Sequence, residues 1–338
     1  MPTEVALGEL SQGRTIVWRG DFHAGKTLLV AIGKAMAATV RAANGSLLER
    51  HLAQRADSAR RAEVLSRFIL DFSADGGLDL PRAPDVRLAV AQAWDLDGQP
   101  FRASLRDLLG AIGAFEWRKN GVPVPALGKD ARVHPHYGVF APVRGEYVTL
   151  IAEEPLPGGW TGDKVAFDVG TGTGVLAAVL AKQGARRIVA TDDDERTLTC
   201  ARENLARLRV TATVQRGLFP DARADLVVCN PPWLPGAAVT ALDRAVYDPE
   251  SQMLRGFLNG LADHLASQGE GWLVMSDLAE RIGLRGPTEL AEWIEAAGLR
   301  VVHRRDTRPT HPRTRETSDP LHVARAAEIT TIWRLAAL

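Results

Sequence analysis

The sequence predicts a doubly wound α/β domain that follows a smaller, mostly helical N-terminal domain. From about residue 160 onward, short apolar runs alternate with amphipathic ones, which is typical of a parallel sheet with helices on both faces. One of these runs leads directly into a glycine-rich loop and then a helix, whereas strand-like runs are few in the first 118 residues. We therefore expect a helical domain over 1–118, a linker over 119–135 and an α/β domain over 136–338.

Length and composition fit a globular protein with a sizeable core. The chain has 338 residues, of which 46% are hydrophobic, and its 41 basic and 41 acidic side chains leave a formal net charge of +0. No overall charge therefore draws it to nucleic acid or to a membrane. The N-terminus lacks an apolar signal segment and no apolar run approaches the ~20 residues of a membrane helix. We expect a soluble, cytoplasmic protein with no membrane partner.

The N-terminal domain contains two clear helix signals. Ser46–Glu49 reads SLLE, a capping box at a helix start. Helical spacing then predicts that one buried face is formed by Leu65, Phe68, Ile69 and Phe72. A Gly-Gly pair at 76–77 ends this pattern, and a second helix is expected over 105–115. The turn-rich composition of 119–135 predicts the linker.

Seven segments of the α/β domain have the composition of strands. They are 164–169, 187–191, 211–215, 225–229, 271–276, 299–304 and 328–335. Helices are expected between the early ones, over 175–183, 194–208 and 250–267. The last two strands are separated by a stretch, 305–327, without a clear helix, so we expect them to form an antiparallel pair.

The glycine loop predicts a nucleotide-type cofactor. Asp168 precedes a loop formed by Gly170, Thr171, Gly172 and Gly174, and glycines let the backbone approach a ligand closely. Asp192 ends the second strand, where a carboxylate can accept hydrogen bonds from both ribose hydroxyls, with Asp193 beside it. This pattern also fits the dinucleotide fingerprint. Asp168 favours S-adenosylmethionine (SAM), because a carboxylate attracts its cationic methionine end and would repel a pyrophosphate.

The fourth strand ends in the tetrapeptide Asn230-Pro231-Pro232-Trp233. In open α/β sheets, ligands bind at the carboxyl ends of the strands, so this segment is expected beside the cofactor. The Asn230 oxygen and a proline carbonyl can each accept an N–H and orient a conjugated nitrogen. The prolines hold that carbonyl rigidly, and Trp233 can stack on a planar substrate. The alternative is a proline-rich strand exit with a packing tryptophan.

Together these motifs resemble class I SAM-dependent methyltransferases of the small-domain type. That group includes bacterial rRNA guanine-N2 methyltransferases and release-factor glutamine methyltransferases. The shared pattern is a loop ahead of the first strand, Tyr137–Arg144, with Phe140 and Arg144 as candidate substrate contacts, then Asp168–Gly174, Asp192 and Asn230–Trp233. The resemblance covers roughly 135–280 and implies a seven-stranded Rossmann-like SAM methyltransferase sheet and methyl transfer to nitrogen, with Asn230 next to the cofactor.

Two departures from the family pattern concern the adenine site and the aromatic residue. Many members carry an acid near the end of the third strand, where this chain has Gly217, so backbone at Leu218 is expected to meet the adenine amine. The residue after NPP is usually Tyr in glutamine methyltransferases and often Phe in rRNA enzymes, whereas here it is Trp233.

Three further features contain residue types that are found in phosphate-binding, metal-binding or reactive-thiol sites. Gly20–Thr27 matches the P-loop pattern, but too few strands surround it for a nucleotidase sheet, so we expect a coincidence. His134 and His136 are expected to be a solvated pair, because nothing completes a metal site, and Cys200 and Cys229 to be reduced thiols. We expect no metal.

The substrate depends on a basic segment over 300–315. In this segment, which includes Arg313 and Arg315, the side chains of Arg304, Arg305 and Arg308 could bind phosphates, and the alternative is a solvated loop. We therefore expect methylation of an exocyclic amine of an RNA base, with rRNA favoured. The alternatives are a protein glutamine, docked by the helical N-terminal domain, a small-molecule amine, or a non-catalytic SAM-binding module. An NAD-dependent oxidoreductase is disfavoured by the NPPW motif.

Overall fold

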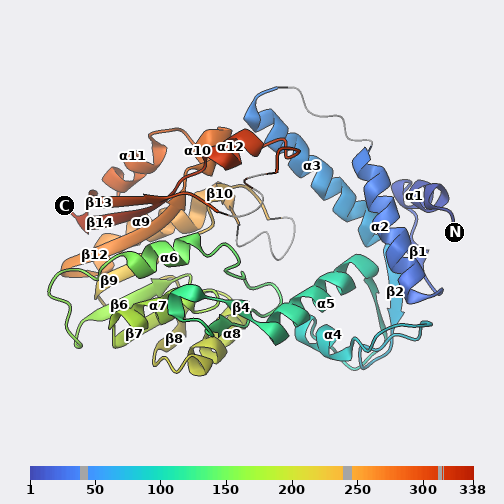
Figure 1. The fold of residues 1–338 in the computed structure, drawn as a ribbon, viewed down its shortest axis with the longest axis horizontal. Coiled ribbons are helices and arrows are strands. Elements are labelled where there is room, and N and C mark those ends of the chain that lie inside the picture. Colours follow the sequence, from blue (N-terminus) through green and yellow to red (C-terminus); the bar gives the residue numbers. More distant parts are fainter. Residues whose placement is uncertain (39–44, 239–245, 311–313, 315) are drawn as a thin grey trace. The chain divides into compact units, whose positions relative to one another are not determined.

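The structure is a computed structural model that describes residues 1–38, 45–238, 246–310, 314 and 316–338 (Figure 1). Internal contacts divide the chain into two units, Met1–Lys119 and Asn120–Leu338. No helix in the described ranges is long and apolar enough to span a membrane. Each unit is considered by itself below.

The N-terminal unit combines five helices with a small sheet. The helices are α1 (Thr3–Ser11), α2 (Phe22–Ala38), α3 (Leu47–Ser66), α4 (Arg87–Ala93) and α5 (Leu105–Asn120). The strands are β1 (Ile16–Val17), β2 (Phe68–Phe72) and β3 (Phe101–Ser104), in the order β1-β2-β3. The capping box at Ser46 is confirmed: its hydroxyl accepts from Glu49 N at 3.2 Å, and the Glu49 carboxylate accepts from Ser46 N at 2.8 Å.

The helix expected to continue through Phe72 is wrong, because the helix ends at Ser66 and Phe68–Phe72 is strand β2. Phe68, Leu70 and Phe72 are buried while Asp71 is exposed, a period of two that the helical spacing concealed. β2 pairs with β1 on one side and β3 on the other, and Phe72 stacks on Phe101 with ring centroids 4.8 Å apart. Tertiary pairing thus decides the conformation of an ambiguous apolar run.

The P-loop match is part of this unit's packing. α2 already begins at Phe22, so Gly25 and Lys26 lie inside the helix instead of in a loop that could wrap a phosphate. A Cβ added at Gly20 or Gly25 would approach the Trp18 ring to within 2.8 or 2.7 Å. These glycines therefore make room for the tryptophan, in agreement with a coincidental match.

The C-terminal unit is built on a seven-stranded sheet. Its strands are β6 (Val165–Val169), β7 (Arg187–Asp192), β8 (Thr213–Arg216), β9 (Ala224–Cys229), β12 (Leu265–Ser276), β13 (Leu299–Thr307) and β14 (Thr330–Ala337). The order is β13-β14-β12-β9-β6-β7-β8, and β14 runs antiparallel to both β12 and β13. All seven expected strands and the antiparallel pair are confirmed.

Helices cover both faces of this sheet (Figure 1). They are α6 (Glu146–Glu153), α7 (Val175–Gln183), α8 (Glu195–Arg207), α9 (Gln252–His264), α10 (Leu278–Ile282), α11 (Glu289–Ala296) and α12 (His322–Ala327). The segment 305–327, expected to lack a helix, contains α12 and the end of β13. The doubly wound arrangement is thus confirmed.

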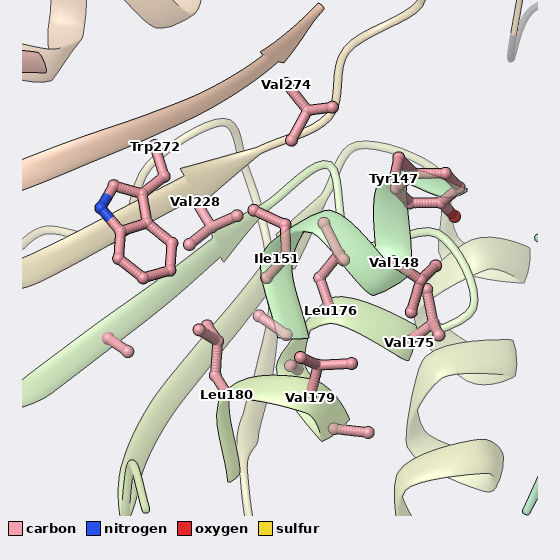
Figure 2. Packing of buried hydrophobic residues seen from close by; sticks show 14 of the residues in the cluster. Tyr147, Val148, Ile151, Val175, Leu176, Val179, Leu180, Val228, Trp272 and Val274 are labelled. Carbon is pink, nitrogen blue, oxygen red and sulfur yellow. The ribbon is translucent and has the colours of Figure 1, made fainter. Parts of the chain in front are cut away.

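Two apolar layers sandwich the sheet because successive strand residues point to opposite faces. Ala166, Val228 and Trp272 pack with α6 and α7, as Figure 2 shows for Val228 and Trp272. Phe167 and Val227 pack on the other face with α9 and α11. A strand buried on both faces must be almost continuously apolar, which is why β9 reads Leu-Val-Val-Cys.

The segment 119–135, expected to be a linker, instead belongs to the C-terminal unit. It contains β4 (Val122–Pro123) and β5 (Arg132–Val133), which pair antiparallel. Val122, Val124 and Val133 are buried in the same core as α6 and α7. The glycines and prolines that suggested a flexible connection therefore shape a hairpin that is fixed by its valines.

Candidate active site

The sheet has its topological switch point between β6 and β9. From β6 the chain proceeds outward to β7 and β8, whereas β9 continues in the opposite direction to β12. The loops that follow β6 and β9 diverge there, and ligands of open α/β sheets bind in the resulting crevice. Both predicted motifs, the glycine loop and Asn230–Trp233, occupy this place.

The glycine loop adopts a conformation that only glycines take easily. Gly170, Gly172 and Gly174 have φ values of 69, 56 and 80°, in the left-handed region. Thr171 N donates to Thr191 O at 2.8 Å, which ties the loop to the end of β7. A Cβ added at Gly172 would meet no atom within 4 Å. The loop thus presents open space at Gly172, as a backbone cradle for a ligand requires.

Asp168 is buried beneath this loop and holds its shape. Its Oδ2 accepts from Thr171 Oγ1 at 2.6 Å and from Ala177 N, in the first turn of α7, at 2.9 Å. Burial raises the pKa of the Asp168 carboxyl to about 6, although these two hydrogen bonds lower it. The predicted attraction to a cationic ligand therefore adds to a loop-fixing function that the sequence did not reveal.

Asp192 closes the second side of the crevice. Its Oδ2 accepts from Gly172 N at 3.2 Å and its Oδ1 from Asp193 N at 3.0 Å. Burial raises the pKa of the Asp192 carboxyl to about 6 against the effect of these N–H donors. The glycine loop and the acid after β7 are therefore in direct contact, while Asp193 is exposed.

The segment expected at the adenine lies against the same strand end. Gly217 has φ 133°, and its N–H donates to Asp192 O at 3.0 Å. Leu218 O accepts from Thr191 Oγ1 at 2.8 Å. One backbone bond and one side-chain bond from Thr191 thus fix this turn beside Asp192, without the acid that is common there in the family that the sequence resembles.

The NPPW segment is fixed internally as well as by its prolines. Trp233 Nε1 donates to Asn230 Oδ1 at 3.0 Å, which orients the carboxamide oxygen. Pro231 is buried and Pro232 half-buried. The half-buried Trp233 ring packs against both core layers. The predicted stacking surface is therefore also a support for Asn230.

Arg285 fixes the backbone of Trp233 by a hydrogen bond to its carbonyl. No local pattern in the sequence predicted this function of Arg285. Its side chain is 1% exposed; Nη2 donates to Trp233 O at 2.9 Å and Nη1 to Glu280 Oε1 at 3.1 Å. Burial raises the pKa of the Glu280 carboxyl, and Arg285 opposes that shift. A buried guanidinium with several donors can hold a loop carbonyl and a carboxylate together.

Asp248 is the second residue that sequence reasoning missed. It is buried, and its two oxygens accept from Met253 N and Leu254 N, each at 3.0 Å, at the start of α9. The intervening Glu250 and Ser251 have φ values of 52 and 54°, a strained conformation for residues with side chains. An Asp shortly before an amphipathic helix is a recognisable cap signal, but the helix was expected to begin at 250.

Several acids share this edge of the sheet. Burial is the main cause that raises the pKa of the Cys229 thiol, and the charges of Asp168, Asp248 and Asp192 raise it further. Cys229 and Cys200 are buried free thiols. The crevice is thus electronegative and suits a cofactor that carries positive charge.

The loop before α6 contributes two predicted substrate contacts. Phe140 is half-buried and packs against the α6–α7 core. Arg144 Nη1 lies 3.7 Å from Oε1 of Glu328, whose side chain is fully buried and also accepts from Ser276 Oγ at 2.7 Å. Burial raises the pKa of the Glu328 carboxyl, and Arg144 lowers it. Arg144 is therefore already paired within the unit.

The first half of the basic segment, up to Thr307, belongs to the edge strand β13. The Arg304 guanidinium lies 3.9 Å from the centre of the Trp333 ring, and Arg305 Nη2 bonds to Glu153 Oε2 at 2.5 Å. Arg308 is exposed. Arg313 and Arg315 lie outside the described residues. Two of the three predicted phosphate contacts are thus engaged by the protein itself.

The histidine pair is not solvated as expected. His136 is buried, with Nε2 3.0 Å from Glu203 Oε2, and His134 N donates to Asn204 Oδ1 at 2.7 Å. Both residues fasten the segment before α6 onto α8. Among the residues that the structure describes, no group of three or more His, Cys, Asp or Glu side chains could hold a metal ion.

Comparison with known proteins adds a family. A family described as methyltransferase small domain matches residues 130–282. The release factor glutamine methyltransferase of Mycobacterium tuberculosis is 32% identical over 258 residues, covering 69% of this chain and 76% of that protein. The ribosomal protein L11 methyltransferase of Geobacter metallireducens is 30% identical over 166 residues, 44% of this chain and 48% of that protein. A methyltransferase structure from Pyrococcus furiosus is 15% identical, with a TM-score of 0.44 over 67% of this chain and 98% of that one.

Proposed function

Because this chain belongs to the methyltransferase small-domain family of SAM-dependent methyltransferases, we propose that it methylates the side-chain amide nitrogen of a glutamine in a protein. The observation that carries this proposal is the Asn230 carboxamide, which is held at the switch point with its oxygen oriented by Trp233. The similarity to a release factor glutamine methyltransferase covers more of the chain than the small domain alone.

The crevice fits SAM by an observation independent of the family. Gly172 faces open space, Asp192 accepts from its N–H, and Asp168 accepts from the neighbouring Thr171 hydroxyl. SAM supplies an electrophilic methyl group on a sulfonium sulfur. Asp192 would accept hydrogen bonds from its ribose hydroxyls, the turn at Gly217 and Leu218 would border its adenine, and Asp168 would attract its cationic methionine end.

The chain's own contribution to the chemistry is orientation. An amide nitrogen is a poor nucleophile because its lone pair is delocalised into the carbonyl group. Asn230 Oδ1 accepts one amide N–H, and the Pro231 carbonyl accepts the other, which aims the nitrogen lone pair toward the methyl group. The Trp233 N–H holds the Asn230 oxygen in place, and the Arg285 guanidinium holds the Trp233 carbonyl at the end of the same segment.

An exocyclic amine of an RNA base offers the same pair of N–H donors and is the second candidate. The engagement of Arg304 and Arg305 leaves it with less support in the described structure. Tritiated SAM tests both: the protein is incubated with a bacterial release factor, with total ribosomal protein and with rRNA. The proposal expects label in protein, and specifically in a glutamine side chain. Label confined to RNA would replace the proposal with the second candidate.

A further inference from the structure

One cavity of the C-terminal unit lies apart from the cofactor crevice. It is an open depression of about 860 Å³ between α7, the end of α8 and the β4–β5 hairpin, which lie side by side (Figure 1). Arg186 lies immediately before β7, and Thr211 two residues before β8. The cavity therefore borders the strand beginnings, whereas Asp192 ends β7 about 17 Å away, the length of a six-residue strand.

Its charge distinguishes it from an ordinary surface hollow. The charged lining side chains are five bases and one acid: Arg132, Lys182, Arg186, Arg207, Arg209 and Asp130. All of these bases are exposed. In the described part of the chain, none of the five forms an ion pair with a carboxylate. Two of them bond only to backbone: Arg132 to the Gly121 carbonyl at 3.1 Å and Lys182 to the Ala126 carbonyl at 2.7 Å.

Such a concentration of unpaired positive charge is unusual in a chain with a formal net charge of +0. The other basic feature, the strand β13, places Arg305 against Glu153 and Arg304 over Trp333. In the cavity the arginines come from three separate segments and converge without a carboxylate partner. Exposed like charges on neighbouring segments repel one another, and a bound anion relieves that repulsion.

We infer that this cavity binds the phosphate groups of an RNA backbone, at a site separate from the methyl-transfer crevice. Arginine guanidinium groups match phosphate oxygens with paired N–H donors. Among the lining residues only His134 carries a ring, and none is a Phe, Tyr or Trp, so the cavity lacks the large aromatic anchors that dominate protein interfaces. The site would therefore recognise phosphates without regard to sequence.

The inference does not depend on which nitrogen is methylated. The nucleotides held at the strand beginnings lie at the opposite end of β7 from Asp192, so they are not themselves the methyl acceptor. It would instead hold the enzyme on a ribonucleoprotein particle while a protein of that particle reaches the crevice. RNA binding and methyl transfer are accordingly separate measurements, and the failure of one leaves the other interpretable.

The test is fluorescence anisotropy with a labelled single-stranded RNA of mixed sequence, titrated at several salt concentrations. The triple variant Arg186→Gln, Arg207→Gln, Arg209→Gln should bind RNA about 100-fold more weakly at 0.1 M salt, and its log–log salt slope should fall by about 2. The matched variant Arg300→Gln, Arg304→Gln, Arg308→Gln loses equal charge from exposed arginines on and beside β13 and should retain both. SAM affinity and melting temperature, measured on all three proteins, verify folding.

Four results would overturn the inference. Wild-type protein that binds no RNA at low salt contradicts it directly. Loss of RNA binding in the β13 variant but not in the cavity variant would transfer the site to the edge strand. Binding of an oligoglutamate peptide in place of RNA, lost in the cavity variant, would identify an acidic protein segment as the ligand. Binding of inorganic phosphate without any binding of RNA would show that the cavity is a site for small anions only.

Discussion

Replacing Trp233 by phenylalanine separates two functions of this side chain. The change keeps an aromatic ring but removes the indole N–H that donates to Asn230 Oδ1 at 3.0 Å. A hydrogen bond of this kind contributes about 0.5–1.5 kcal/mol, so releasing the Asn230 carboxamide should lower kcat about 2- to 10-fold. Because the ring remains, KM should change less than kcat. Asn230→Ala removes the acceptor completely and should lower kcat about 10²–10³-fold, which is the upper limit for the effect of Trp233→Phe on kcat.

Steady-state kinetics with the glutamine substrate measure both constants. Trp160→Phe is the matched control, because its indole N–H is buried without a partner among the described residues. That variant should keep both constants near wild type. If Trp233→Phe raised KM and left kcat unchanged, the tryptophan would act as a stacking surface and the orienting bond would have no catalytic effect.

Three other perturbations test the site. Gly172→Ala places a Cβ in the open cradle at φ 56° and should weaken SAM binding about tenfold in calorimetry. The control Gly184→Ala, at another left-handed glycine at the end of α7, should keep the wild-type SAM affinity. Equal SAM affinities of the two variants would contradict the role of Gly172 in the cradle. Burial raises the carboxyl pKa values of Asp168 and Asp192 to about 6, and binding of a cation lowers them, so protons leave when SAM binds. SAM affinity should therefore fall about tenfold from pH 7 to pH 5. A SAM affinity that does not change with pH would refute this. Arg285→Lys keeps the positive charge but cannot bond to the Trp233 carbonyl and the Glu280 carboxylate together, so kcat should fall while SAM affinity is retained. Loss of SAM affinity would show general unfolding instead.

The large sheet was predictable because its signals are local. β9 is apolar on both faces, and the Gly170–Gly174 loop must follow a strand and precede a helix to work at all. The contact of Asp192 with Gly172 follows from the same logic, since adjacent parallel strands end at the same edge. The proximity of the two motifs at one edge of the sheet could therefore be predicted from the sequence, and the catalytic role of that crevice stays a proposal.

The errors arose where distant partners decide the structure. Phe68–Phe72 fits a helical spacing as well as a strand, and only pairing with β1 and β3 selects the strand. The hairpin at 122–133 looks like a linker until its valines meet α6 and α7. Arg285 lies far along the chain from Trp233, so no spacing rule could connect them. The basic cavity likewise joins residues from three separate segments.

Peptide mass spectrometry of the modified substrate tests the proposed chemistry most directly. A release factor is incubated with SAM and either the wild-type protein or Asn230→Ala, whose SAM affinity is measured in the same preparation. We expect the wild-type protein to place a single methyl group on a glutamine side-chain amide. The variant Asn230→Ala should still bind SAM but form this product about 10²–10³-fold more slowly. A methyl group on a lysine or an α-amine, or transfer by Asn230→Ala at the wild-type rate, would contradict it.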